Sequence, residues 1–419
     1  MMRAVTEPST NDLAGERGAS SRLPAIDALR GVAALAVLLS HLPFSTSSTT
    51  EAGHDPGVHT ALPAWVNGTC EYGAYGVHLF LIVSGFCIHM AWARQSTAQP
   101  QIDFGHFWKR RLHRLYPPYF VALLVSIAGL YVLHTWVLRG GPSFAAHFGY
   151  ANTSQLALDA ILLVFLAQNF NNAGQRIGNG PFWTLALEEQ LYLLYFPLLW
   201  MRRRWSWTQT LGVVAAVTLT WRTVAAFAPD DLPLFFLGPS RWFEWVLGAL
   251  AVEAYTRRVE LPPWCSSAKV GVALLVFAFA VVNSEHLGAP RLAFIPVSDM
   301  AVGFALFVLV NAACAARWAE SNKGLVTRFC AWVGTFSYSL YLTHQPVVVA
   351  AKHIGMRAGL GTVGILCLRL ALPLAVGWLF YILIERRFLS ASRRRVRTDS
   401  PVATVAPATR ADAKLPSSA

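Results

Sequence analysis

The sequence predicts an all-α protein of the polytopic membrane class: a transmembrane helical bundle of about ten spans with one short interfacial or re-entrant helix. Of its 419 residues, 55% are hydrophobic and only 13% are charged, a composition too apolar for a soluble globule. Runs of about 20 apolar residues recur along the whole chain, and each is long enough to cross a bilayer as a helix.

Both ends of the chain are predicted to lie outside the membrane domain. Residues 1–21 are polar, small and contain proline, and residues 389–419 carry an arginine cluster and few large apolar side chains. We expect both to be disordered cytoplasmic tails that flank a membrane domain over residues 22–388. No small-residue cleavage site follows the first apolar run, so we expect an uncleaved span and not a removed signal peptide.

The apolar runs, taken in order, predict the spans. They lie near residues 26–44, 76–93, 119–138, 183–200, 208–227, 240–256, 268–283, 297–316, 330–350 and 361–384. The run from Leu156 to Phe170 is short and is closely followed by NNAGQRIGNGP. We therefore predict an interfacial or re-entrant helix there.

The loop charges predict the orientation of these spans. With a cytoplasmic N-terminus, the inside segments carry most of the Lys and Arg, including the clusters at 109–114 and 202–204, whereas the loop 42–75 has neither. Basic residues concentrate on the cytoplasmic side. Counting 156–170 as an eleventh span would place the cluster at 202–204 outside. We predict a multi-pass protein of the cell (inner or plasma) membrane with both termini cytoplasmic.

Net charge and cysteine content point to no further partner. The formal net charge is +12, but most of the cations fall in loops and tails, where they set orientation. The six cysteines show no CxxC spacing and lie mostly in or beside apolar runs, as small buried hydrophobes do. We therefore predict a protein embedded in a lipid bilayer, with no nucleic-acid partner and no metal site.

The first apolar run, LPAIDALRGVAALAVLLSHLPF, has an ionisable residue at each end. Arg30 and His41 are eleven residues apart, close to three helical turns, so they share a helix face about 16 Å apart along the axis. Ionisable residues within a span usually face the protein interior and mark functional sites. Alternatively, Arg30 reaches toward the interface and His41 only caps the helix.

The second cytoplasmic segment, FWKRRLHRLYPPYF, concentrates cations beside aromatic side chains, and we expect Pro117 and Pro118 to end it. Arg111 and Arg114 are three residues apart and share a helical face, which gives two planar guanidiniums suited to phosphate or carboxylate. The positive-inside bias alone would explain several of these charges.

The fourth span opens with PFWTLALEEQLYLLYFPLLW. Pro181 suits a first helical turn, and Glu188 and Glu189 follow about two turns later, near the outer face. Glu188 and Tyr192 share a face, so this carboxylate could lie against His41 if the first and fourth spans touch. The alternative is an interfacial pair of carboxylates solvated by water.

Other polar residues also fall within predicted spans. Arg241 and Glu244 have the i,i+3 spacing of a local ion pair. Arg222 and Arg369 lie in mid-span, and the sequence does not identify their partners. His344, in SYSLYLTHQPV, is more typical of a satisfied core histidine than of a catalyst.

Taken together, five segments resemble the integral-membrane acyltransferase family 3, over about residues 22–388. AIDALRGVAALAVLLSH is similar to the family's opening pattern of Arg or Lys, ten residues, then His, and GVHLFLIVSGFCI is similar to its second-helix pattern GVDLFFVLSGFLI. RRLHRLYPPYF, WTLALEEQLYLLYFPLL and SYSLYLTHQP resemble three later motifs. One departure is His78, which stands where the family usually has Asp.

The resemblance implies an acyltransferase that moves an acyl group, usually acetyl, from acetyl-CoA or another acyl-CoA to a hydroxyl of a glycan or sugar-bearing metabolite. The acyl-CoA is a donor substrate, and no permanently bound cofactor is expected. Arg111 and Arg114 would bind its phosphates, and its pantetheine arm would run along the Arg30 face. His41 would act as general base near the outer face, oriented by Glu188. Arg30 is the third residue predicted to be catalytic.

Further residues are expected to bind substrate. We predict substrate contacts for His78, Glu189, Tyr192 and His344. The departure at His78 puts any acid role in doubt, although an imidazole there could still bind or orient the acceptor. Whether a covalent acyl-enzyme forms stays open, with Ser84 and Tyr341 as candidates.

Two other classes of protein are compatible with the residues alone. Buried charges also line the paths of membrane transporters and polysaccharide flippases, although no inverted repeat is evident. The second class is a non-catalytic membrane subunit of an envelope assembly. Transfer or hydrolysis of acyl-CoA by the purified protein separates the enzyme from both.

Overall fold

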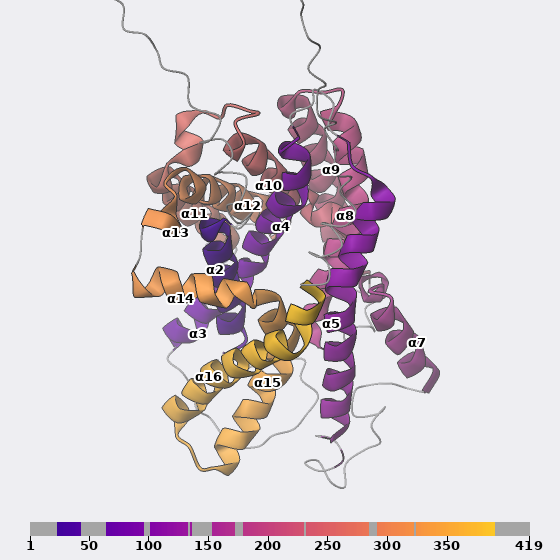
Figure 1. Cartoon of the computed structure of the whole chain (residues 1–419), viewed down its shortest axis with the longest axis vertical. Helices are drawn as coiled ribbons and strands as arrows, with labels where there is room; N and C mark the ends of the chain where they lie inside the picture. Colours follow the sequence, from indigo (N-terminus) through magenta and orange to yellow (C-terminus); the bar gives the residue numbers. More distant parts are fainter. Residues whose placement is uncertain are drawn as a thin grey trace, which may run out of the picture.

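A computed structural model describes residues 23–42, 64–95, 101–132, 135, 153–171, 179–229, 232–284, 291–321 and 324–389. All regular elements within these residues are helices (Figure 1), so the all-α prediction is confirmed for this part of the chain. The predicted tail at 1–21 lies outside the described residues, as does the predicted tail at 389–419 apart from Leu389, which is still helical.

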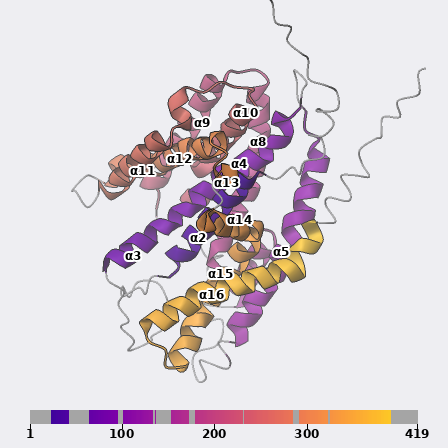
Figure 2. The ribbon, with the colours of Figure 1, turned by 60° about the vertical axis from the view of Figure 1, so that its left-hand side comes forward.

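Three packed helices form the centre of the molecule. Helix α2 (Pro24–Ser40) lies beside α4 (Gly76–Ala93), and α10 (Trp242–Tyr255) packs against α4 (Figures 1 and 2). Around them lie α8 (Trp183–Arg202), α9 (Trp207–Phe227), α11 (Ala268–Val282) and α12 (Arg291–Ala315). The main apolar core lies among α4, α8, α10 and α12, where Phe86, Tyr195 and Trp245 are fully buried.

The remaining helices pack on the other side of α2. The long helix α5 (Phe104–Val132) runs along one flank with α7 (Thr153–Val164) outside it (Figure 1). Helix α14 (Leu325–Thr335) crosses α2, and α15 (Ser337–Arg357) pairs with α16 (Thr362–Phe380). A π-helical turn at Tyr381–Glu385 continues α16. The short helix α3 (Ala64–Glu71) and a 3₁₀ turn at Tyr72–Tyr75 lead into α4, and α13 (Trp318–Ser321) precedes α14.

Glycine allows two of these helix crossings to be very close. A Cβ built on Gly31 of α2 would lie 1.8 Å from the carbonyl oxygen of Cys330, and one on Gly334 of α14 would lie 1.8 Å from that of Asp27. The α4–α10 crossing is equally close. A Cβ built on Gly85 would lie 2.0 Å from the carbonyl oxygen of Trp245, and one built on Gly248 would lie 2.0 Å from that of Ile82. Small residues permit such backbone contact between helices.

The predicted number of spans is only partly supported. Among the described residues, four helices are long and apolar enough to cross a membrane: Gly68–Ala93, Trp207–Phe227, Ile295–Ala315 and Thr362–Leu389. Each coincides with a predicted span, but the count of about ten is not confirmed. Several other predicted spans fold into shorter helices, of 17, 14 and 15 residues for α2, α10 and α11. A helix needs about 20 residues to cross the hydrocarbon core of a bilayer.

Three local features refine the sequence expectations. Pro117 and Pro118 do not end the basic segment, because α5 continues through both as one helix; proline has helical φ and costs the helix hydrogen bonds without forcing a stop. The predicted span 330–350 is interrupted at Phe336, between α14 and α15. The run 156–170 folds as α7 followed by a 3₁₀ turn at Gln168–Phe170, in agreement with a short, separate helix.

Candidate functional site

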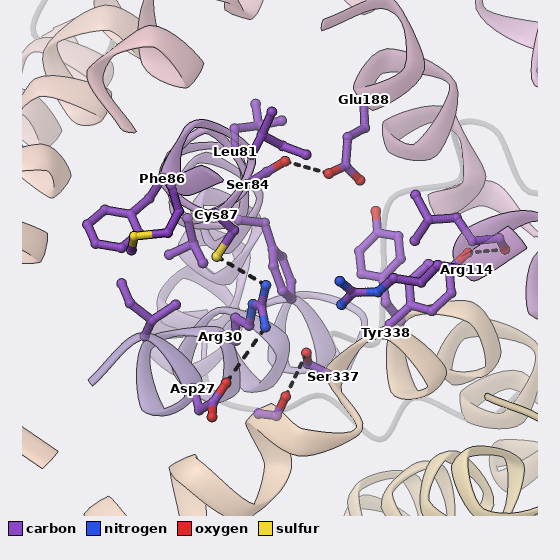
Figure 3. Close-up of a pocket in the computed structure, with 18 of the residues that line it drawn as sticks. Asp27, Arg30, Leu81, Ser84, Phe86, Cys87, Arg114, Glu188, Ser337 and Tyr338 are labelled. Carbon is purple, nitrogen blue, oxygen red and sulfur yellow. Dashed lines mark hydrogen bonds and ion pairs between the residues drawn. The ribbon is translucent and has the colours of Figure 1, made fainter. Parts of the chain in front are cut away.

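A cavity of about 550 Å³ lies where α2, α4, α5, α8 and α15 meet (Figure 3). It extends along α4 from Arg94 to Val77, about 25 Å of helix at the α-helical rise. All five sequence segments singled out above contribute to its wall, with Arg30, Ser84, Cys87, Arg111, Arg114, Glu188, Tyr192, Tyr338 and Tyr341. The packing therefore brings together residues that are far apart in the sequence.

The wall of the cavity carries more positive than negative side chains. Four arginines, Arg30, Arg94, Arg111 and Arg114, face three carboxylates, those of Asp27, Glu188 and Glu385. The apolar remainder of the wall has a low dielectric, in which the positive excess attracts an anion strongly.

Arg30 projects from α2 into the cavity and is held by two neighbours. Its Nη2 donates to the Sγ of Cys87 at 3.3 Å, and its Nη1 lies 3.7 Å from the Oδ1 of Asp27 (Figure 3). The close α2–α14 crossing at Gly31 fixes the helix turn from which Arg30 projects.

Arg111 and Arg114 enter from α5 without any ion pair among the described residues. The guanidinium of Arg111 lies over the rings of Phe107 and Tyr192, 5.6 and 5.8 Å from their centroids. Arg114 extends toward Arg30 (Figure 3). Burial, and then the charges of Arg111 and Arg30, lower the pKa of Arg114. Half-buried cations without counter-ions are costly, so this part of the cavity suits a phosphate group.

Glu188 lies in the middle of the cavity wall and accepts two short hydrogen bonds. Its Oε1 accepts from the hydroxyl of Ser84 at 2.5 Å and from that of Tyr192 at 2.6 Å. The i,i+4 spacing predicts the contact with Tyr192, whereas the contact with Ser84 joins α8 to α4. The expected pairing of Glu188 with His41 is not found; the Oε1 of Glu188 accepts from these two hydroxyls instead.

His41 and His344 form a pair next to Tyr341, one of the residues of the cavity wall. Their ring centroids are 4.9 Å apart, and the ring of Tyr341, which lines the cavity, is 5.5 Å from that of His344. The hydroxyls of Tyr341 and Thr184, two residues of the cavity wall, lie 2.5 Å apart. His41 is not part of the cavity wall; it is the C-cap of α2, where Arg369 donates to its backbone oxygen at 2.8 Å.

The hydrogen bonds assign a tautomer to both imidazoles. Ser40 gives its only hydroxyl proton to the Val37 carbonyl at 2.7 Å, so the Nδ1 of His41, 3.1 Å from the Ser40 oxygen, carries the proton. The Nδ1 of His344 faces the Leu340 and Tyr341 carbonyls at 3.2 and 2.8 Å and must donate as well. Each neutral ring therefore keeps a bare Nε2, the nitrogen that can accept a proton.

His78 belongs to a separate buried network. Its ring contacts Glu244 at 3.0 Å, Asp299 at 3.8 Å and Arg241 at 3.3 Å. The predicted Arg241–Glu244 pair is present at 3.3 Å, and the partner of Arg222 is Asp299, at 2.6 Å. Sequence reasoning did not single out Asp299, although a lone carboxylate in an apolar run was a usable signal.

Two other acidic residues complete the description. Glu189 lies beside the main cavity, on a small hollow that it shares with Leu115, Tyr119 and Tyr338. Glu385, which the sequence reasoning missed, lines the main cavity from the π-helical turn and accepts a hydrogen bond from Ser339 at 2.5 Å. Its signal was again a carboxylate within an apolar run.

Comparisons with known proteins give a consistent result. A family model described as an acyltransferase domain matches residues 23–388. The chain is 26% identical over 350 residues to the peptidoglycan O-acetyltransferase OatA of Listeria monocytogenes, covering 78% of this chain and 49% of that protein. It is 26% identical over 356 residues to the O-acetyltransferase OatA of Staphylococcus aureus (78% and 51%) and 24% identical over 362 residues to the putative peptidoglycan O-acetyltransferase YrhL of Bacillus subtilis (79% and 49%).

The chain thus spans about half the length of the curated relatives it matches. No solved structure matches it significantly.

Proposed function

The chain belongs to the family of this acyltransferase domain, and from that premise we propose that it is a membrane O-acyltransferase that moves an acyl group, in the simplest case acetyl, from cytosolic acyl-CoA to a hydroxyl of an envelope glycan. The observation that carries the proposal is the composition of the cavity wall. It combines many apolar side chains with Arg111 and Arg114, which form no ion pair among the described residues. The names of the relatives support peptidoglycan as the acceptor.

The charge of this cavity and its extent along α4 support acyl-CoA as the donor. The phosphates of acyl-CoA would bind Arg111 and Arg114, which have no competing carboxylate within ion-pair distance among the described residues. The pantetheine arm would extend past Arg30 along α4, where the wall consists mainly of apolar side chains such as Leu81, Phe80 and Val77. Binding energy from these remote contacts positions the thioester for reaction.

The acceptor hydroxyl would lose its proton to His41. The bare Nε2 of the neutral ring is the required proton acceptor, and an imidazole titrates close to neutral pH. His344 would pack beside the substrate and keep the His41 ring in place. The donor would enter from the cytoplasm and the acceptor from the outer face, in the orientation that the loop charges predict.

A direct assay of the purified protein tests the proposal. Labelled acetyl-CoA is incubated with a soluble peptidoglycan fragment, and the expected result is acceptor-dependent release of CoA together with an acetylated sugar detected by mass spectrometry. Glycan movement across vesicles without any acyl transfer would favour a transporter and contradict the proposal.

A further inference from the structure

Ser84 has an unusual hydrogen bond for a serine in the middle of a helix. Such a hydroxyl commonly bonds to a carbonyl of its own helix, but the Ser84 hydroxyl instead crosses to α8 and donates to the Glu188 carboxylate at 2.5 Å. Its oxygen also accepts from the indole Nε1 of Trp245 at 3.4 Å. The side chain lines the cavity about midway between Arg94 and Val77.

Three residues of the wall have the arrangement of an activated nucleophile. Ser84 is hydrogen-bonded to a base, Glu188, and the base is in turn oriented by a third group, the hydroxyl of Tyr192 at 2.6 Å. This order of nucleophile, base and orienting group is typical of covalent catalysis. Arg30 donates to Cys87, which lies one helical turn from Ser84. A cation therefore lies near the place where the carbonyl oxygen of the thioester would become negatively charged during attack by Ser84.

We propose that Ser84 is a catalytic nucleophile that takes the acyl group from the donor before the acceptor receives it. The inference rests on the function proposed above and deepens it. The geometry supports it because Glu188, expected to assist His41, is bonded to Ser84 instead, and because His41 lies outside the donor cavity. An ester at Ser84 would let CoA leave toward the cytoplasm before the acceptor arrives.

The reaction balances in two steps. In the first, Ser84 Oγ attacks the thioester carbon, its proton passes to Glu188, the carbon–sulfur bond breaks and CoA leaves as a thiolate that water protonates. A thiolate is a sufficiently good leaving group because thiols have a pKa of about 8.5. In the second, the acceptor hydroxyl gives its proton to His41 and attacks the ester carbon. Ser84 Oγ leaves and recovers the proton from Glu188, and His41 releases its proton to water, which replaces the proton taken up by the thiolate.

Isotope exchange isolates the first step. Purified protein is given acetyl-CoA and radiolabelled free CoA without an acceptor, so label enters acetyl-CoA only through an acyl-enzyme. We expect exchange with the natural protein and loss of exchange, to the level without protein, for Ser84→Ala. His41→Ala should block transfer to the glycan but still support exchange. Mass spectrometry should find the acetyl group on the peptide that contains Ser84.

Controls separate the possible failures. Ser298→Ala removes a hydroxyl that bonds to the carbonyl of Ile295 away from the cavity and should leave exchange unchanged. Should Ser84→Ala not fold, Ser84→Cys provides the second variant, expected to form a hydroxylamine-sensitive thioester at that position, and absence of this thioester would overturn the proposal. Full transfer by folded Ser84→Ala, or transfer without exchange by the natural protein, would overturn the covalent step while preserving the proposed function. Absence of both donor binding and transfer in the natural protein would instead reject the function itself.

Discussion

At the scale of single residues, the proposed role of His41 leads to the most direct prediction. His41→Ala should lower acyl transfer by about 10²–10⁴-fold, the usual contribution of a general base, because the variant lacks the bare Nε2 that would accept the acceptor's proton. Turnover per folded molecule is the quantity to measure, and donor binding should persist because His41 lies outside the cavity.

A second histidine of the same region serves as the control. His353 lies further along the helix that carries His344 and does not line the cavity, so His353→Ala should keep transfer near normal. Near-normal turnover of His41→Ala would show that another residue is the general base, and His344 and His78 would be the next residues to test.

The two unpaired arginines lead to a prediction about donor affinity. Arg111→Ala or Arg114→Ala should each weaken binding of acyl-CoA, because a charge-assisted phosphate contact is lost, and the effect should shrink as salt screens the remaining attraction. Binding of a labelled acyl-CoA at several salt concentrations measures it.

Arg204→Ala is the matched control for these arginines. Its guanidinium lies over Trp200, 4.7 Å from the ring centroid, outside the cavity. Donor affinity that stays unchanged in both cavity variants would limit Arg111 and Arg114 to a role in membrane orientation.

Residue contacts within one helix could be predicted from the sequence, and contacts between helices could not. The Arg241–Glu244 and Glu188–Tyr192 pairs follow from i,i+3 and i,i+4 spacing. The Ser84–Glu188 bond joins residues 104 positions apart, and helical periodicity does not state which helices touch. For the same reason the sequence predicted that Glu188 has a polar partner on another helix but named His41, whereas the partner in the structure is Ser84.

At the scale of elements, the close crossing of α2 and α14 predicts sensitivity to added volume. Gly334→Ala should lower the free energy of unfolding by about 1–3 kcal/mol or more, because the new methyl would meet the backbone oxygen of Asp27 at 1.8 Å and neither helix can yield by changing a rotamer. Thermal unfolding of the purified protein in detergent measures the change.

Gly212→Ala provides the comparison within another helix. A Cβ at Gly212 of α9 has nothing within 4 Å, so this substitution should be neutral or raise the free energy of unfolding by about 0.5–1 kcal/mol through helix propensity. Equal stability of the two variants would contradict the close α2–α14 contact.

The sequence located the helices better than it located their ends. Apolar runs identified α4, α9, α12 and α16, each long and apolar enough for a span. The run at 330–350 gave no sign of its break at Phe336, because apolar residues continue on both sides of it. The change of direction between α14 and α15 depends on what each helix packs against.

At the scale of the whole molecule, the loop charges predict how the protein lies in the membrane. A reporter fused within the segment 42–75 should be found outside the cytoplasm, and reporters at both termini should be found inside, because basic residues are retained on the cytoplasmic side. Enzymatic reporters active in only one compartment make the measurement. A cytoplasmic signal from segment 42–75 would invert the proposed entry routes of donor and acceptor.

The cavity has a volume of about 550 Å³, and a finite volume limits the size of the molecule that it can hold. A donor whose phosphates bind Arg111 and Arg114 fills part of this space with its pantetheine arm, so that only the remainder is left for the acyl chain. Acetyl needs little of that remainder, whereas a long fatty chain needs far more. The size of the cavity therefore favours donors with short acyl groups.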